Sequence, residues 1–445
     1  MTTGPRIPLR LRRLDLGLTD GETMGERRLL CRRGAVPDDR IRERTRAILD
    51  GLRANPDDGV RRANIEYGGG LPDGRLVLER SELEVARDRL SGEVRTALER
   101  AIANVRRFAG SQRPTSSTTE IVPGVSIERR WVPLRRVGCY VPGGSAAYPS
   151  SLIMTVVPAR VAGVDEIVVA SPATANGHLD PVLLAAAGLL EVDAFVVAGG
   201  AQAIGALAFG LPEVGLEPVD RIVGPGNPWV TAAKLELAGE VGIDLPAGPS
   251  EGLVLVDHSA DPELAAADLL TQAEHGPDSP AILVATDETV AEAVEAAVAR
   301  QLVGAARREI LATALERHGR IVLAPDLHAA IDFVNDYAPE HLSIDVEPLE
   351  ETVGRIRNAG SVFVGRWAPE SAGDYATGAN HVLPTGGLAR ACGALSVEAF
   401  GKFVQVQRLT REGLAILRPT IGTLANAEGL MAHRAAVELR FTDDR

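Results

Sequence analysis

Gln272 and His275 stand three residues apart at what reads as the end of a helix. On a helix, both side chains project from one side of the last turn, with Asp268 one turn below them. A cation held there lies near the helix C-terminus, where the macrodipole favours positive charge. The pattern is either half of a metal site or an exposed polar helix end. These residues alone favour the second interpretation, because glutamine is an uncommon zinc ligand and one histidine makes no site.

Glu340 and His341 are a second candidate pair, suited to acid/base chemistry. Adjacent residues cannot share a face of a strand or a helix, but in a turn both side chains can reach one cleft. In isolation, a solvated glutamate beside a structural histidine is the more common explanation of such a pair.

Two further stretches carry polar groups. Residues 370–385 form a run of small and polar residues that predicts a long functional loop, in which Asp374 would be a carboxylate ligand and His381 a base or a scaffold hydrogen-bonder. Glu428 and His433 are five apart, which on a straight helix leaves them on different sides. They serve one pocket only if the pocket wraps the helix or the helix loosens. Otherwise both are surface side chains.

Three glycine-rich turns follow apolar runs, at 141–145, 199–202 and 224–227. Glycine allows close backbone approach, and the N-terminus of a following helix favours a phosphate. Ligands of open α/β sheets bind beyond the carboxyl ends of the strands. Three such turns in one unit favour a nucleotide site, although none is GxGxxG and each alone is equally a tight strand-to-helix turn.

The helix that would carry Gln272 and His275 has readable limits. Asp261 suits an N-cap and Pro262 suits the first helical turn. The Gly-Pro pair at 276–277 stops the helix, because the residue before a proline is pushed out of the α region.

From residue 137 onward, short β-branched runs alternate with alanine-rich helices. Strand, helix, strand at this spacing implies parallel pairing, since parallel neighbours need a crossover. Continuous apolar strands also suit a sheet covered on both faces. The expected strands are 137–141, 166–170, 194–198, 221–223, 252–256, 281–285, 320–324 and 361–365.

These patterns predict an α/β protein with two Rossmann-like parallel-sheet units, an N-terminal helical segment and a helical C-terminal tail. Residues 1–35 would form an irregular N-terminal arm. The first α/β domain would be discontinuous, over 36–139 and 251–395, and the second, nucleotide-binding α/β domain would span 140–250. The tail, 396–445, looks helical without strands. Because it cannot bury its own apolar face, it must dock on the body or on a partner subunit.

Composition limits the class of protein. The chain of 445 residues is long enough for two or three domains, and 45% hydrophobic with 24% charged residues is typical of a soluble globular protein. The formal net charge of -13 argues against nucleic acid or anionic membranes as partners. Three scattered cysteines and the lack of an apolar signal or membrane-spanning run favour a cytoplasmic location.

Taken together, these stretches closely resemble the histidinol dehydrogenase family over about residues 136–439. Each motif is moderately specific, whereas their order and joint presence are highly specific. The motifs are YVPGGSAAYPS, GGAQAIGALA, VGPGNPWVTAAK, DLPAGPSE, TQAEHGPDS, APEHL, SAGDYATGANHVLPT and AEGLMAHRAAV.

The resemblance implies a set of site residues, position by position. The implied zinc ligands are Gln272, His275, Asp374 and His433. The implied acid/base residues are Glu340 and His341. The implied substrate contacts are Ser250, Gln272, His275, His341, Asp374, Glu428 and His433, with His381 beside them. The implied NAD contacts are Tyr140, Gln202 and Asn227, one near each glycine-rich turn.

The resemblance further implies a homodimer in which tail residues act in the other subunit's site. It implies that histidinol is oxidised through bound histidinal to histidine in two hydride transfers to NAD⁺. His341 would take the alcohol proton and Glu340 would activate water. Three rival interpretations are a paralogue acting on another polar alcohol, a catalytically silent nucleotide-binding module, and a zinc hydrolase, the last disfavoured because HExxH is absent.

Overall fold

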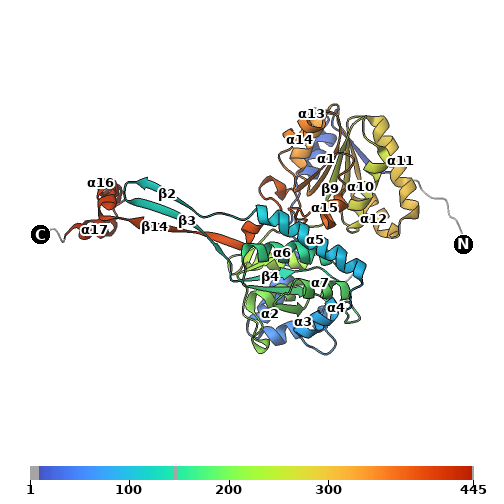
Figure 1. Ribbon diagram of the computed structural model, residues 1–445. Coiled ribbons are helices and arrows are strands. Elements are labelled where there is room, and N and C mark those ends of the chain that lie inside the picture. The colour runs from blue at the N-terminus through green and yellow to red at the C-terminus, as the bar shows by residue number, and fades with distance from the viewer. Residues whose placement is uncertain (1–9, 144–147, 443–445) are drawn as a thin grey trace.

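Two parallel β-sheets organise the residues that the computed structural model describes, 10–143 and 148–442. The six-stranded sheet is the centre of the first lobe, and the five-stranded sheet is the centre of the second lobe. A long arm projects away from both lobes (Figure 1). The last two residues of the glycine-rich turn at 141–145 lie outside the described residues.

In the first lobe all paired strands are parallel, in the order β1-β11-β10-β9-β12-β13. Every residue of β9 and β10 is buried, because helices cover both faces of the sheet. The strands are β1 (Arg12–Asp15), β9 (Gly252–Val256), β10 (Ala281–Ala285), β11 (Arg320–Leu323), β12 (His341–Asp345) and β13 (Ser361–Val364). One face carries α10 (Pro262–Glu274), α11 (Glu288–Gly304) and α12 (Arg308–His318). The other face carries α1 (Gly21–Cys31), α13 (Leu327–Tyr337) and α14 (Leu349–Arg355).

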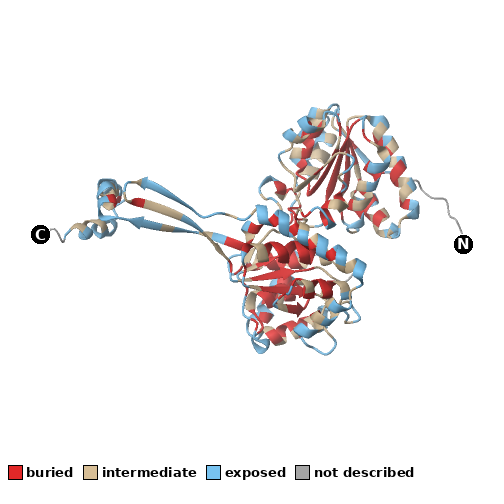
Figure 2. Cartoon of the chain, in the orientation of Figure 1, coloured by how far each residue is buried: buried red, intermediate tan, exposed pale blue. Residues whose placement is uncertain are grey.

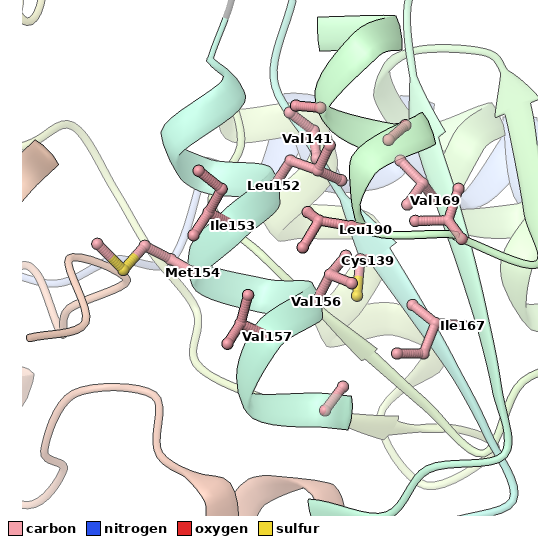
Figure 3. Packing of buried hydrophobic residues seen from close by; sticks show 14 of the residues in the cluster. Cys139, Val141, Leu152, Ile153, Met154, Val156, Val157, Ile167, Val169 and Leu190 are labelled. Carbon is pink, nitrogen blue, oxygen red and sulfur yellow. The ribbon is translucent and has the colours of Figure 1, made fainter. Parts of the chain in front are cut away.

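The second lobe has the parallel order β6-β5-β4-β7-β8. Its strands are β4 (Arg136–Tyr140), β5 (Glu166–Ser171), β6 (Ala194–Val197), β7 (Arg221–Val223) and β8 (Gly242–Ile243). One face carries α4 (Arg80–Asp88), α5 (Gly92–Ser111), α6 (Pro149–Ala162) and α7 (Pro181–Leu189). The other carries α2 (Asp39–Arg53), α3 (Pro56–Tyr67), α8 (Gly200–Phe209) and α9 (Pro228–Leu237). In Figure 3, Val156 of α6 lies beside Cys139 of β4, and Leu152 lies beside Val141.

The arm is a three-stranded antiparallel sheet with two helices at its tip. It contains β2 (Ser117–Val122), β3 (Val125–Pro133), β14 (Gly401–Leu409), α16 (Arg411–Ala427) and α17 (Met431–Glu438), with β3 between the other two strands. The prediction of a tail without strands is therefore wrong for β14. Its residues are mostly exposed, so periodic burial could not reveal the strand, which is held by its ladder to β3. Figure 2 shows that most of the arm is exposed or half-buried.

The N-terminal segment is more regular than the sequence indicated. Strand β1 pairs with β11 at the edge of the first sheet, and Leu14 is buried there at 2% exposure. Helix α1 follows, with Asp20 as its N-cap. The prediction of an irregular arm over 1–35 is wrong for these elements. A four-residue strand that begins with two arginines gives little periodicity, and its partner strand lies about three hundred residues away.

Helices α2 to α5 pack against the second sheet, whereas the sequence analysis assigned them to the first domain. Their apolar residues join the two clusters on the faces of the second sheet, as Leu49 and Leu98 illustrate. The assignment of 36–139 to the first domain is therefore wrong. Helical periodicity identified the buried face of each helix but not the sheet that covers it.

The chain passes from the second lobe to the first through residues 244–251, and α9 holds that segment. Lys234 is 2% exposed, forms an ion pair with Asp244, and donates to Leu245 O at 3.0 Å and Gly224 O at 3.1 Å. One turn earlier, Thr231 Oγ1 donates to Ala247 O at 2.6 Å. The connection between the lobes is thus anchored before it reaches β9. None of the helices in the described ranges is long and apolar enough to cross a membrane.

Candidate active site

The end of α10 adopts the predicted form. Asp261 Oδ1 accepts from Glu263 N at 3.0 Å, and the helix stops at Glu274 with His275 as its C-cap. Gln272 is 1% exposed, and its Nε2 donates to Ser250 Oγ at 3.4 Å. His275 is exposed, and its Nδ1 lies 3.2 Å from Gln272 O. Gln272 and His275 therefore do lie together at the helix end.

Gln272 lies directly against the backbone of β9. A Cβ on Gly252 would be 2.6 Å from Gln272 Oε1 and 2.7 Å from its Cγ. Such separations are shorter than any real contact, so glycine at 252 is what lets the glutamine occupy this position.

Glu340 and His341 lie where the chain enters β12. Ala338 has a φ of 53°, and this left-handed turn precedes the strand, whose first residue is His341. Glu340 Oε2 accepts from Ser250 Oγ at 2.8 Å and from Glu251 N at 2.9 Å. His341 Nδ1 lies 3.2 Å from Gln272 Oε1 and 3.9 Å from Glu340 Oε2. The two side chains do reach one place, as the turn hypothesis required.

Helix α15 (Glu370–Tyr375) brings two carboxylates to the same place. Glu370 and Asp374 are four apart on the helix and are 3% and 8% exposed. Glu370 Oε1 lies 3.7 Å from His275 Nδ1 and 3.7 Å from His341 Nδ1. Ligand atoms of His275, Glu370 and Asp374 lie within 4.8 Å of one another. One nitrogen and two carboxylates at this spacing are a donor set that could hold a divalent cation.

Crowded carboxyl groups make the cluster electrostatically unusual. Burial, followed by the charges of Asp374 and Glu340, holds the pKa of Glu370 well above its usual range. Burial also raises the pKa of Asp374, which the nearby His275 opposes. Within the described chain, Glu370 Oε1 has no hydrogen-bond donor. A buried carboxylate without a partner is costly, and a metal ion is the partner that would relieve it.

Burial favours the neutral form of His341 and of His381. Burial, with smaller effects from His275 and His381, puts the pKa of His341 well below its usual value. Burial also lowers the pKa of His381 to about 4. The Nε2 atoms of His341 and His381 both lack a hydrogen-bond partner among the described residues. Two neutral imidazoles with unused nitrogens can each offer a hydrogen bond or a lone pair to a bound ligand.

The cluster lies at the amino edge of the first sheet. Gly252 and His341 are the first residues of β9 and β12, and α10 ends before β10 begins. In Figure 1, α15 lies on the side of the first lobe nearest to the second. The sequence argument placed a nucleotide site beyond the carboxyl ends of the strands that precede the glycine-rich turns, whereas this cluster lies at the amino edge of the other sheet.

The three residues expected to contact NAD gather at the carboxyl edge of the second sheet. Tyr140 ends β4, and its hydroxyl accepts from Gly200 N at 3.4 Å, while a Cβ on Gly224 would meet Tyr140 O at 2.1 Å. Gln202 is 3% exposed, and its Nε2 donates to Gly68 O at 3.2 Å. Asn227 is exposed and caps α9, accepting from the peptide nitrogens of its first turn. The turns thus converge, although the side chains of Gln202 and Asn227 already make contacts within the chain.

Glu428 is the C-cap of α16 and His433 lies in α17, and both helices lie at the end of the arm far from the two lobes (Figure 1). Both residues are exposed. Within the described part of this single chain they do not join the cluster of His275, Glu370 and Asp374.

Glu370 is the principal residue that sequence reasoning missed. It was treated as the first residue of a loop, so its relation to Asp374 went unused. The signal was present, because a Glu and an Asp four residues apart share one face if the segment ESAGDY is helical. Pro369 directly precedes this helix as its N-cap residue.

A family model, two relatives and a solved structure that match most of the chain all carry the same family name. The family model described as histidinol dehydrogenase matches residues 31–441. A protein of Halobacterium salinarum named histidinol dehydrogenase is 46% identical, over 91% of this chain and 94% of its own. One from Natronomonas pharaonis, with the same name, is 47% identical over 90% and 93%. The crystal structure of histidinol dehydrogenase from Elizabethkingia anophelis superposes with a TM-score of 0.90 at 35% identity, over 97% and 98% of the two chains.

Proposed function

This chain belongs to the histidinol dehydrogenase family, and from that premise we propose that it oxidises L-histidinol through bound histidinal to L-histidine, with NAD⁺ and a zinc ion. These would be the last steps of histidine biosynthesis. Free cysteines at 31, 139 and 392 support a cytoplasmic location. The observation that carries the proposal is the meeting of Glu340, His341, Gln272 and His275 with two buried carboxylates at one sheet edge.

The residues that would hold zinc are Gln272, His275 and Asp374, with His433 supplied by a second subunit. A nitrogen, a carboxylate and an amide oxygen suit zinc and leave room for substrate atoms. A bound zinc ion would orient the substrate imidazole and polarise its alcohol oxygen. Glu370 borders the same space and fits either as a further oxygen donor or as a counter-charge to the substrate ammonium.

His341 is placed to take the alcohol proton. Its neutral imidazole has an unused Nε2, and Gln272 Oε1 fixes the ring from the Nδ1 side. A neutral histidine can act as a base in each of two oxidations, provided that it returns its proton in between. Ser250 and Asp374 would bind the substrate beside it.

Glu340 is placed to activate the water that converts the aldehyde into the acid. Two donors hold its Oε2, which leaves Oε1 available for a water molecule. NAD⁺ would accept the hydrides, and Tyr140, Gln202 and Asn227 would position it against the second lobe. The protein would contribute by holding the acid/base residues of the first lobe and NAD⁺ at the second lobe beside the same substrate molecule.

The proposed homodimer would bring Glu428 and His433 of one subunit into the site of the other. Two observations support it. Apolar side chains at the tip of the arm are exposed, among them Leu424 at 57% and Leu439 at 67%. The helices that carry both residues, α16 and α17, also lie away from the lobes of their own chain (Figure 1).

We expect mixed dimers to recover activity. His341→Ala and His433→Ala homodimers should both be inactive. In a heterodimer of the two, one site combines an intact body with an intact arm, so purified heterodimers should show about half of wild-type activity. Differently tagged subunits, refolded together and purified on both tags, provide the material. Heterodimers without activity would contradict sharing across subunits.

The function itself is tested by one assay. Purified protein with histidinol and NAD⁺ should form two NADH for each histidine produced, and a zinc chelator should abolish the signal. Restoration by added Zn²⁺ excludes inhibition by the chelator itself. A paralogue would prefer another polar alcohol, and a silent nucleotide-binding module would form no NADH with any.

A further inference from the structure

Arg33 lies two residues beyond α1 and reaches the segment that leads into β9. Its Nε donates to Glu251 Oε2 at 2.9 Å, and its Nη2 donates to Glu251 Oε1 at 2.7 Å. The remaining donors reach Leu30 O at 2.8 Å and Tyr337 O at 2.9 Å. The guanidinium carbon also lies 3.3 Å from the centroid of the Tyr337 ring. Bidentate pairing and ring stacking give the side chain one well-defined position.

Glu251 is in turn part of the support of the acid/base pair. Its backbone N donates to Glu340 Oε2 at 2.9 Å, and its backbone O accepts from His341 N at 3.1 Å. The preceding residue, Ser250, donates to the same oxygen of Glu340. Any displacement of the backbone at 250–251 therefore moves both Glu340 and His341.

We propose that Arg33 is a positioning residue for the Glu340–His341 pair, acting through its bidentate hold on the carboxylate of Glu251. The inference rests on the proposed function and deepens it, because it gives the N-terminal segment a part in the reaction. Nothing in the motifs of the sequence pointed to Arg33.

The surroundings of Arg33 and Glu251 explain why loss of their ion pair would affect Glu340. The side chains of Arg33 and Glu251 are 16% and 4% exposed. Two cavities, of about 660 and 350 Å³, flank α1, and Arg33 lines both. Without the guanidinium, water from either side would reach Glu251 and compete for its carboxylate, and the anchor would become mobile. Gly386 N, which also donates to Glu251 Oε1 at 3.1 Å, cannot replace two charged bonds.

Four variants separate positioning from folding. Arg33→Met removes the fork but leaves Glu251 buried without a cation. The double variant Arg33→Met with Glu251→Gln removes both charges, so that no unpaired carboxylate remains to unfold the protein. Arg33→Lys keeps the charge without the planar fork. Arg28→Met, at an exposed position on the preceding helix α1, is the matched control.

The measurement is kcat and KM of the zinc-loaded protein, with histidinol and separately with histidinal, beside the melting temperature. For the double variant we expect a melting temperature near that of the wild type, a KM for NAD⁺ within about twofold, and a kcat lowered about tenfold or more. The loss should be larger with histidinal, since Glu340 has two bonds to the displaced segment. Arg33→Lys should fall in between, and Arg28→Met should match the wild type.

A double variant that is folded and has wild-type kcat on both substrates would overturn the proposal, as would a fall confined to the melting temperature. If the wild type itself forms no NADH with histidinol, the proposed function fails instead. The two failures are therefore distinguishable within one series.

Discussion

Glutamine at position 340 is expected to leave alcohol oxidation running while it lowers formation of the acid by about 10²- to 10⁴-fold, the usual contribution of a positioned general base. The amide can still accept from Ser250 and Glu251, so the local structure should survive. It cannot take a proton from water. Rapid-quench analysis of one turnover should therefore show one NADH and accumulated aldehyde where the wild type yields two NADH and histidine.

The pH dependence of the wild type provides a second readout. Burial raises the pKa of Glu340 to about 8, so the base form grows as the pH rises towards that value. The rate of acid formation should rise over the same range in the wild type, and this rise should be absent in Glu340→Gln. Glu351→Gln, an exposed site on α14, is the control. Undiminished acid production by Glu340→Gln would remove Glu340 from the role of base.

Alanine at position 275 is expected to abolish zinc binding and to lower kcat by about 10³-fold, because a bound metal contributes several kcal/mol of transition-state stabilisation. The exposure of His275 makes a folding defect from this change small. Removing the imidazole leaves Glu370 and Asp374 as two crowded carboxyls and takes away the nitrogen ligand that this chain supplies beside them. Zinc per subunit, measured by elemental analysis after dialysis, should fall from near one to near zero.

A matched histidine separates this effect from surface chemistry. The side chain of His258 is 74% exposed and lies away from the cluster, so His258→Ala should keep both zinc and activity. Stoichiometric zinc in His275→Ala would show that the ion is held elsewhere. In that case the cluster at α15 would need another explanation.

The parts of the fold that local rules determine were predictable. The cap at Asp261, the stop at 276–277 and the apolar strands each follow from a few neighbouring residues, and the structure has them. Strand β12 was not anticipated, because its sequence, HLSID, contains no continuous apolar run. The polar residues proposed for acid/base chemistry lie at the start of this strand, so the segment was interpreted as a turn.

What sequence could not supply was the pairing of distant segments. Helix α2 shows which of its faces is apolar, but only the packed chain shows that this face meets α8 and α9. Strand β14 is exposed on most of its length and depends on β3 for its form. Arg33 carries no motif, and its role follows only from where Glu251 lies.

The candidate site was predictable to the extent that the family resemblance carried it. Gln272 and Glu340 were named, and the structure brings them within reach of His341. Glu370 was outside the resemblance and outside the helix assignment, so both routes missed it. The roles of these residues remain the predictions stated above.

The close approach of Gly252 to Gln272 can help to interpret the sequences of relatives. A side chain at 252 would push the amide away from His341 without altering any of the proposed ligands. A relative that keeps every ligand but has lost this glycine would therefore look intact to a motif search and yet be unable to seat the amide. Checking positions 252 and 272 together would identify inactive relatives that a count of catalytic residues alone would classify as functional.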